Sequence, residues 1–117
     1  MATGNILWDA SGLIKRYLIE IGSETVDAVF AEADGIPMSV TPWGYLETYA
    51  ILRRRCNAGA FNYAAYQNAV TALQREVITG GGFGLIPISD STIFAAASLI
   101  DAHQINSADA AILAAYL

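Results

Sequence analysis

The feature that most constrains the fold of this chain is a threefold alternation of short apolar runs with longer helical patterns. The runs "NILWD" (5–9), "IPMSV" (36–40) and "LIPI" (85–88) are apolar enough to be buried strands, and a helix-like stretch follows each of them. Strands that alternate with helices in this way form a parallel sheet covered by helices. Because 117 residues suffice for one core and no linker is apparent, we predict a single α/β domain over residues 1–117.

Capping residues indicate where the helices begin. The clearest start is Thr41-Pro42, a capping hydroxyl followed by proline at the first helical position. We expect further caps at Ser23, at Ser89 or Asp90, and at Ser107, and a turn at Asp34-Gly35. The predicted helices cover residues 11–20, 24–33, 42 to about 57–59, 61–78, 91–103 and 108–117.

The composition favours a soluble cytoplasmic protein. No apolar run reaches the roughly 20 residues that span a bilayer, and the N-terminus lacks the basic and cleavage regions of a signal peptide. The single Cys56 cannot form an intrachain disulfide and fits a reducing compartment. His103 has no partner at metal-ligand spacing. We therefore expect no membrane association and no histidine or cysteine chemistry.

The net charge of −5 argues against a protein that coats nucleic acid by bulk electrostatics. The six basic residues nevertheless fall in three places, which are Lys15-Arg16, Arg53–Arg55 and Arg75. Such clusters can be local phosphate-binding patches on an acidic body, or simply solvated helix faces. The charge pattern alone leaves both interpretations open.

Three acids stand in apolar surroundings close to the end of a strand or the start of a helix. Asp9 follows an apolar strand, Glu47 lies one turn into its helix, and Asp109 lies in the first turn of a largely apolar helix. Each has an ordinary explanation, as a helix cap, an exposed residue or a charge that favours a helix N-terminus. In an open parallel sheet, however, ligands bind beyond the carboxyl ends of the strands, where Asp9 is expected.

Considered together, the three acids predict a metal site. Carboxylates that converge repel one another, and burying them unpaired is costly. A hard divalent cation such as Mg²⁺ or Mn²⁺ prefers oxygen ligands and neutralises this charge. Such an ion also suits phosphodiester hydrolysis, because it activates water and offsets charge on the transition-state phosphate.

At these residues the sequence resembles the PIN-domain nucleases, especially the VapC-type toxins of toxin–antitoxin pairs. The three blocks that carry the resemblance are "ILWDASGLIKRYL", "TPWGYLETYAILRRR" and "SADAAILAAYL". In their order they resemble the family's strand followed by an acid, its Glu on an Ala/Leu/Arg-rich helix, and its Asp-Ala at the start of an apolar helix. The resemblance covers essentially the whole chain and implies a PIN-like α/β/α sandwich with a short parallel sheet.

The resemblance also implies a function and a set of site residues. It implies a metal-dependent endoribonuclease, the toxin of a toxin–antitoxin pair, that uses Mg²⁺ or Mn²⁺ and forms a homodimer. Its partners would be an RNA substrate and a cognate antitoxin protein. The metal ligands would be Asp9, Glu47 and Asp109, and Ser11 would support the first of them by orienting its carboxylate. The residues expected to contact RNA phosphates are Lys15, Arg16, Arg53 and Arg54.

One departure from the family keeps an alternative open. The family usually continues into a further strand with a fourth acid, often as Thr-x-Asp, whereas this C-terminally short sequence ends at Leu117 without it. We therefore expect that the edge of the first strand is exposed or covered by a partner, and that the metal site is incomplete. The alternative function is a catalytically inactive PIN-like module that binds a partner protein.

Other classes fit less well. A haloacid-dehalogenase phosphotransferase also carries an acid after its first strand, but its second acid would fall at Ser11. A receiver domain would need paired early acids, which this sequence lacks. The aromatic residues could stack on bases, although core or dimer contacts are the more common role of such residues.

Overall fold

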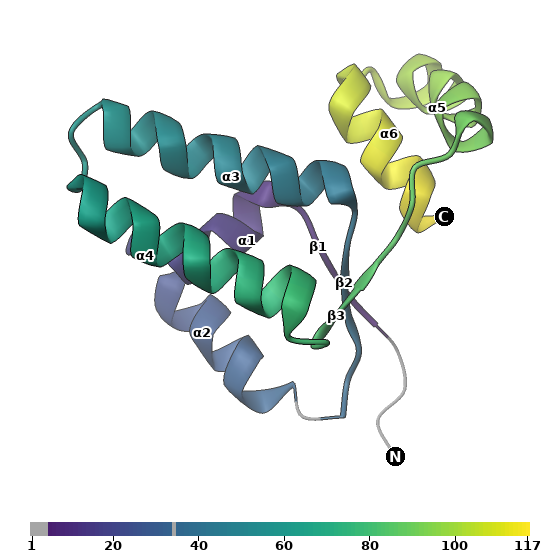
Figure 1. The fold of residues 1–117 in the computed structure, drawn as a ribbon. Coiled ribbons are helices and arrows are strands. Elements are labelled where there is room, and N and C mark those ends of the chain that lie inside the picture. The colour runs from purple at the N-terminus through teal and green to yellow at the C-terminus, as the bar shows by residue number, and fades with distance from the viewer. Residues whose placement is uncertain (1–4, 34) are drawn as a thin grey trace.

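The computed structural model describes residues 5–33 and 35–117, so Asp34 of the expected turn lies outside the described residues. Its sheet has three parallel strands in the order β1 (Ile6–Trp8), β2 (Met38–Val40) and β3 (Phe83–Leu85) (Figure 1). Trp8 is paired with Val40, and Val40 with Leu85, so the three strands end together. The predicted α/β class with a short parallel sheet is confirmed.

The third strand begins earlier than we predicted from residues 85–88. The strand pairs from Phe83, whose ring packs against Phe30 with the centroids 5.8 Å apart. The last bond of this ladder is donated by Ile86 to the carbonyl of Val40, at 3.0 Å. Pro87 has no N–H to donate, and the strand pairing ends before it.

The helices follow the predicted order. Their bounds are α1 (Ala10–Tyr17), α2 (Ser23–Glu32), α3 (Pro42–Asn57), α4 (Tyr63–Gln74), α5 (Asp90–His103) and α6 (Ser107–Tyr116). The helix predicted over 61–78 ends as a π-helical turn, η1 (Arg75–Thr79). The predicted caps Thr41 and Ser89 are confirmed, since their side chains accept hydrogen bonds from the backbone N–H groups of Gly44 and Thr92.

Two predicted caps are wrong. Ser23 lies inside α2, where its buried hydroxyl donates to the carbonyl of Leu18 and accepts from the N–H of Glu20. The last helix is capped by Asn106, one residue before the predicted Ser107. An asparagine oxygen accepts from the third helical residue as well as a serine oxygen does, so the sequence offered two adjacent candidates.

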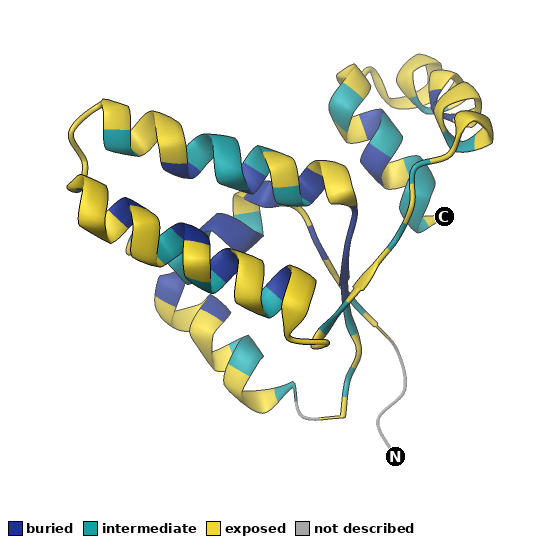
Figure 2. Ribbon diagram, viewed as in Figure 1, coloured by how far each residue is buried: buried dark blue, intermediate teal, exposed yellow. Residues whose placement is uncertain are grey.

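The core is built by the sheet and helices α1 to α4. Leu13, Leu52, Leu73 and Val40 are fully buried there, and Trp8 packs against Phe30. Figure 2 shows the buried positions concentrated on the surfaces that these elements turn toward one another. This packing fixes β1, β2, α1 and α3, the four elements that carry the first two predicted acids.

Helices α5 and α6 form a separate hairpin, which we call the α5–α6 hairpin (residues 90–116). The two helices pack mainly against each other and project from the rest of the domain (Figure 1). Of their residues only Ala96, Ala110 and Ile112 are buried. The hydroxyl of Tyr116 donates a hydrogen bond to the carbonyl of Trp8 and so ties α6 to the end of β1. None of the described helices is long and apolar enough to cross a membrane.

Candidate active site

Asp9 follows β1 directly and serves as the N-cap of α1. Its Oδ1 accepts hydrogen bonds from the Gly12 N–H at 3.0 Å and from the Ser11 hydroxyl at 2.9 Å. Both bonds go to the same oxygen, and the residue as a whole is exposed. Asp9 can therefore be both a helix cap and a site residue. One of its oxygens caps α1, while the carboxylate faces solvent at the carboxyl end of the sheet.

Glu47 is positioned by a tightly packed first turn of α3. Thr41 caps this turn, and the hydroxyl of Thr48 donates to the carbonyl of Gly44 at 2.8 Å. A Cβ atom at Gly44 would lie 2.9 Å from a methyl group of Val40, so only glycine lets α3 approach β2 this closely. The approach holds Glu47 near the end of β2, next to the end of β1.

The carboxyl group of Glu47 is in an unfavourable environment for a charge. Its Oε1 is buried and has no hydrogen-bond partner among the described residues. Burial raises the pKa of Glu47, and the negative charges of Asp109 and Asp9 raise it further, against smaller opposite effects of Trp43 and Arg54. The structure thus brings the three predicted acids close enough for their charges to interact.

Asp109 approaches the site from the α5–α6 hairpin. Its Oδ2 accepts a hydrogen bond from the side-chain amide of Asn106 at 3.0 Å, while its own backbone N–H donates to the side-chain Oδ1 of Asn106 at 2.8 Å. Asp109 and Asp9 line the same cavity of about 440 Å³, which lies between β1 and α6. The sequence did not indicate that Asn106 also orients the carboxylate of Asp109. An N-cap asparagine needs only its side-chain oxygen, whereas here its amide group contacts Asp109 as well.

The three carboxylates fit a hard divalent cation in chemistry, and the unpartnered Oε1 of Glu47 is the atom that most needs one. Their spacing is wider than that of a closed metal site. Within residues 5–33 and 35–117, no group of three His, Cys, Asp or Glu side chains is close enough together to hold a metal ion. Asp9 and Glu47 belong to the packed part of the domain, and Asp109 to the hairpin.

A second cavity, of about 620 Å³, extends from Asp9 toward the basic residues. Lys15 and Arg54 line it together with Asp9 and Ser11. Two further lining residues, Glu20 and Arg55, were not among the predicted site residues. Arg55 belongs to the basic cluster noted in the sequence, whereas no sequence signal distinguished Glu20 from an ordinary surface acid.

The other two predicted RNA-contacting residues have different neighbours. Arg16 binds Asp27 at 2.9 Å and Glu76 at 3.0 Å, and its guanidinium lies 4.4 Å from the ring centroid of Phe30. These contacts join α1, α2 and η1, and they hold the half-buried side chain of Arg16 in a network within the fold.

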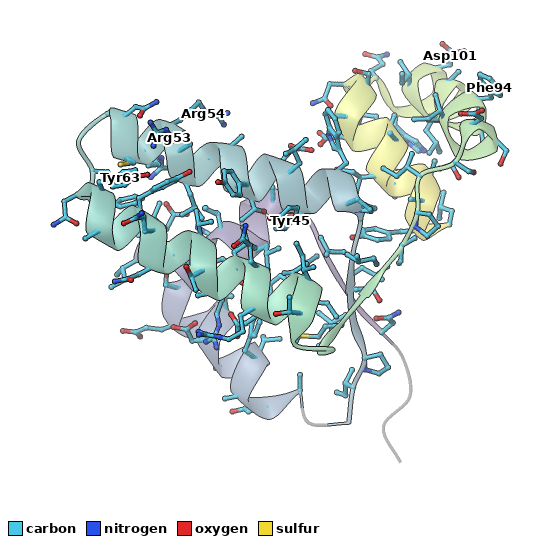
Figure 3. The ribbon with its side chains drawn as sticks, in the orientation of Figure 1. Tyr45, Arg53, Arg54, Tyr63, Phe94 and Asp101 are labelled. Atoms are coloured by element: carbon cyan, nitrogen blue, oxygen red, sulfur yellow. The ribbon has the colours of Figure 1, made fainter. Side chains whose placement is uncertain are left out.

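Arg53 lies over the ring of Tyr66, 5.2 Å from its centroid, and so faces α4. Figure 3 shows Arg53 near Tyr63 of α4, with Arg54 projecting from α3 on a different side.

The parallel sheet is followed by one acid after β1, one on the helix after β2 and one on a late apolar helix. The chain has a VapC-type PIN fold, as its likeness to a solved structure shows. It is similar to the crystal structure of Mycobacterium tuberculosis VapC20, described as a toxin that cleaves the sarcin–ricin loop. The two superpose with a TM-score of 0.74 over 95% of this chain and 79% of that chain, at 15% sequence identity. Neither a protein-family profile nor a curated protein sequence matches this chain.

Proposed function

We propose that this protein is a metal-dependent endoribonuclease that hydrolyses RNA phosphodiester bonds and acts as the toxin of a toxin–antitoxin pair. The observation that carries the proposal is the environment of Glu47. Its buried Oε1 has no hydrogen-bond partner in the described part of the chain, and burial and the charges of Asp109 and Asp9 raise its pKa. A carboxylate in such an environment costs stability and is a marker of a functional site. The likeness to a sarcin–ricin-cleaving toxin supports the choice of RNA as the substrate.

Asp9, Glu47 and Asp109 would hold one Mg²⁺ or Mn²⁺ ion. When bound, such an ion polarises the scissile phosphate and lowers the pKa of a coordinated water. Ser11 keeps one oxygen of Asp9 in place through its 2.9 Å hydrogen bond, and Asn106 does the same for Asp109 at 3.0 Å. The carboxylate oxygens outside these bonds remain available to the ion.

The RNA would run through the cavity that Asp9 shares with Lys15 and Arg54. Arg54 has no ion pair among the described residues and is available for a phosphate. Arg16 and Arg53 remain part of the proposed RNA-binding set, although contact with RNA would require them to leave Glu76 and Tyr66. We expect Arg54 to contribute more to RNA binding than either of them.

The test is cleavage of single-stranded RNA in Mg²⁺ or Mn²⁺ by the wild-type protein and by Asp9→Asn. This substitution keeps an oxygen that can cap α1, so the fold should survive while cleavage falls at least about 100-fold, as it does when a catalytic electrostatic group is lost. Asp101→Asn, an exposed acid on α5, is the matched control and should cleave normally. Equal cleavage by wild type and Asp9→Asn would remove the assignment.

A second candidate is a non-catalytic PIN-like module that binds a protein partner. The observation that favours it is that no three described His, Cys, Asp or Glu side chains reach metal-binding spacing. Calorimetry with Mn²⁺ separates the two functions. Binding that is lost in Glu47→Gln supports the nuclease, and the absence of binding in the wild type supports the module.

We also propose that the protein forms a homodimer. The α5–α6 hairpin exposes several apolar side chains, including Phe94 at 77% and Ile93 at 47% exposure. Phe94 projects from α5 in Figure 3. Apolar surface of this kind on so small a domain is typical of an interface.

A further inference from the structure

The cavity that runs from Asp9 contains an acid with no place in the proposed chemistry. Glu20 lies in the loop between α1 and α2, and its two carboxylate oxygens have different partners. Its Oε1 accepts from the Lys15 ammonium at 3.0 Å, while its Oε2 lies 3.5 Å from the Arg55 guanidinium. The carboxylate therefore bridges a cation of α1 and a cation of α3, which are the two walls of the cavity.

The loop holds Glu20 in this position through polar contacts. The buried Ser23 accepts from the Glu20 N–H at 2.9 Å, and its N–H donates to the Glu20 carbonyl at 3.0 Å. Lys15 also donates to the carbonyl of Ile21 at 2.7 Å. The flanking Ile19 and Ile21 are 97% and 95% exposed, so apolar burial of their side chains does not hold the loop.

Gly22 completes this arrangement. Its φ of +97° lies in the left-handed region, which strains other residues. A Cβ atom at Gly22 would also meet the side chain of Lys15 at 3.0 Å. Glycine at this position therefore allows the turn and leaves room for the lysine to reach Glu20.

The balance of charge in the cavity indicates what Glu20 does. Three cations line the cavity, Lys15, Arg54 and Arg55, and the single negative charge of Glu20 is shared between two of them, Lys15 and Arg55. Each of its oxygens occupies a place that one oxygen of a phosphate diester could take. Phosphate oxygens form strong charge-assisted hydrogen bonds with lysine and arginine, so substrate and Glu20 would compete for the same donors.

We propose that Lys15 and Arg55 form a phosphate-binding subsite of the RNA groove, and that Glu20 occupies this subsite as a built-in competitor of the RNA backbone. The proposal rests on the proposed function, since it takes RNA as the ligand of the groove. Glu20 weakens binding by requiring each incoming strand to displace it. An RNA strand that does not also contact Arg54 and the three carboxylates gains too little binding free energy to displace Glu20. Glu20 therefore limits the binding of strands that are not positioned for cleavage.

The test compares the affinities of Asp9→Asn and Asp9→Asn/Glu20→Gln for a short fluorescent single-stranded RNA, measured by anisotropy over a series of salt concentrations. The Asp9→Asn background prevents cleavage in both proteins. Glu20→Gln should bind roughly 3- to 10-fold more tightly at low salt, because two partly exposed ion pairs no longer have to be broken. The slope of log affinity against log salt should steepen by about 0.7 for each additional phosphate contact.

Two further variants separate the subsite from a general effect of charge. Glu24→Gln in the same background changes the net charge equally, on an exposed residue of α2 that has no ion pair among the described residues, and its affinity should stay at the background value. Arg55→Gln, added to Asp9→Asn/Glu20→Gln, should remove most of the gain. Circular dichroism shows whether each variant is folded.

The inference is overturned if Glu20→Gln binds RNA no more tightly than the background, or if Glu24→Gln gains as much. It is also overturned if none of the proteins binds RNA. The nuclease proposal fails on a different measurement, since it depends on metal-dependent cleavage by the protein with Asp9 intact. A protein that cleaves RNA but shows no effect of Glu20→Gln would keep the function and lose the subsite.

Discussion

The substitution Glu47→Gln should stabilise the protein when no divalent ion is present. The Glu47 carboxyl group is partly buried, its Oε1 has no hydrogen-bond partner in residues 5–33 and 35–117, and Asp109 and Asp9 repel its charge. Glutamine has nearly the same shape and no charge, so it keeps the packing and removes both the repulsion and much of the desolvation cost. The variant that should abolish metal binding should therefore also be the more stable protein.

The size of the effect follows from the cost of an unpaired polar group. A buried group without a partner costs about 1–3 kcal/mol, and the amide recovers only the charged part of that cost. We expect the free energy of unfolding to rise by about 1 kcal/mol, which for a domain of this size raises the melting temperature by roughly 3–5 °C. Urea or thermal unfolding in the presence of a chelator measures the difference.

The effect should depend on pH in a defined direction. Because the pKa of Glu47 is higher in the folded than in the unfolded protein, the folded state binds more protons between the two values. The contribution of Glu47 to stability is therefore lost as the pH rises through this window. The advantage of Glu47→Gln should be largest at neutral pH and should disappear below the ordinary glutamate pKa.

Addition of Mg²⁺ or Mn²⁺ should reverse the order of stability. An ion at 100 times its dissociation constant stabilises the folded protein by about 2.7 kcal/mol, and the glutamine variant should not share this gain. Thr71→Ser, an exposed position on α4, serves as a control that should respond to the ion as the wild type does. The reasoning is refuted if Glu47→Gln is less stable than the wild type without metal, or if both proteins respond alike to the ion.

Three further outcomes are expected from other parts of the structure. Tyr116→Phe removes the hydrogen bond to the carbonyl of Trp8 and should lower the free energy of unfolding by about 1 kcal/mol. Amide hydrogen exchange in α6 should become faster, and unchanged exchange would show that this bond does not hold the hairpin. Arg16→Gln breaks the contacts with Glu76 and should lower the free energy of unfolding by about 1–3 kcal/mol. A loss of RNA affinity at unchanged stability would instead show that Arg16 binds the substrate. Phe94→Glu should convert the proposed homodimer into a monomer in sedimentation experiments, and a dimer that persists would place the interface elsewhere.

The parts of the fold that sequence could predict are those determined by neighbouring residues. Thr41-Pro42 begins a helix because the capping oxygen and the proline act within one turn. Asp9 could be placed at the end of β1 because an apolar run ends there. The third strand was shifted because the residue that decides its start, Phe83, pairs with Met38, which lies far away in the chain.

The parts of the site that sequence could not predict depend on distant contacts. Nothing near Arg16 in the chain indicates that it meets Glu76, 60 residues away. We predicted Glu20 as the last residue of a helix over 11–20, whereas α1 ends at Tyr17 and Glu20 lies in the loop that follows. Its contacts with Lys15 and Arg55 therefore could not be inferred from helical spacing. The order of the three acids and the resemblance of their blocks gave Asp9, Glu47 and Asp109, but only the structure showed that their charges interact.

Because the α5–α6 hairpin packs mainly against itself, its position would affect the affinity of the site for an ion. Asp9 and Glu47 belong to the packed part of the domain and Asp109 to the hairpin, so only molecules in which the hairpin is docked against β1 would offer the complete set of ligands. The apparent dissociation constant is then the intrinsic one divided by the docked fraction. Substitutions in the hairpin that lie far from the three carboxylates would then change the fraction of molecules that bind an ion. A partner that binds the hairpin would change this fraction in the same way.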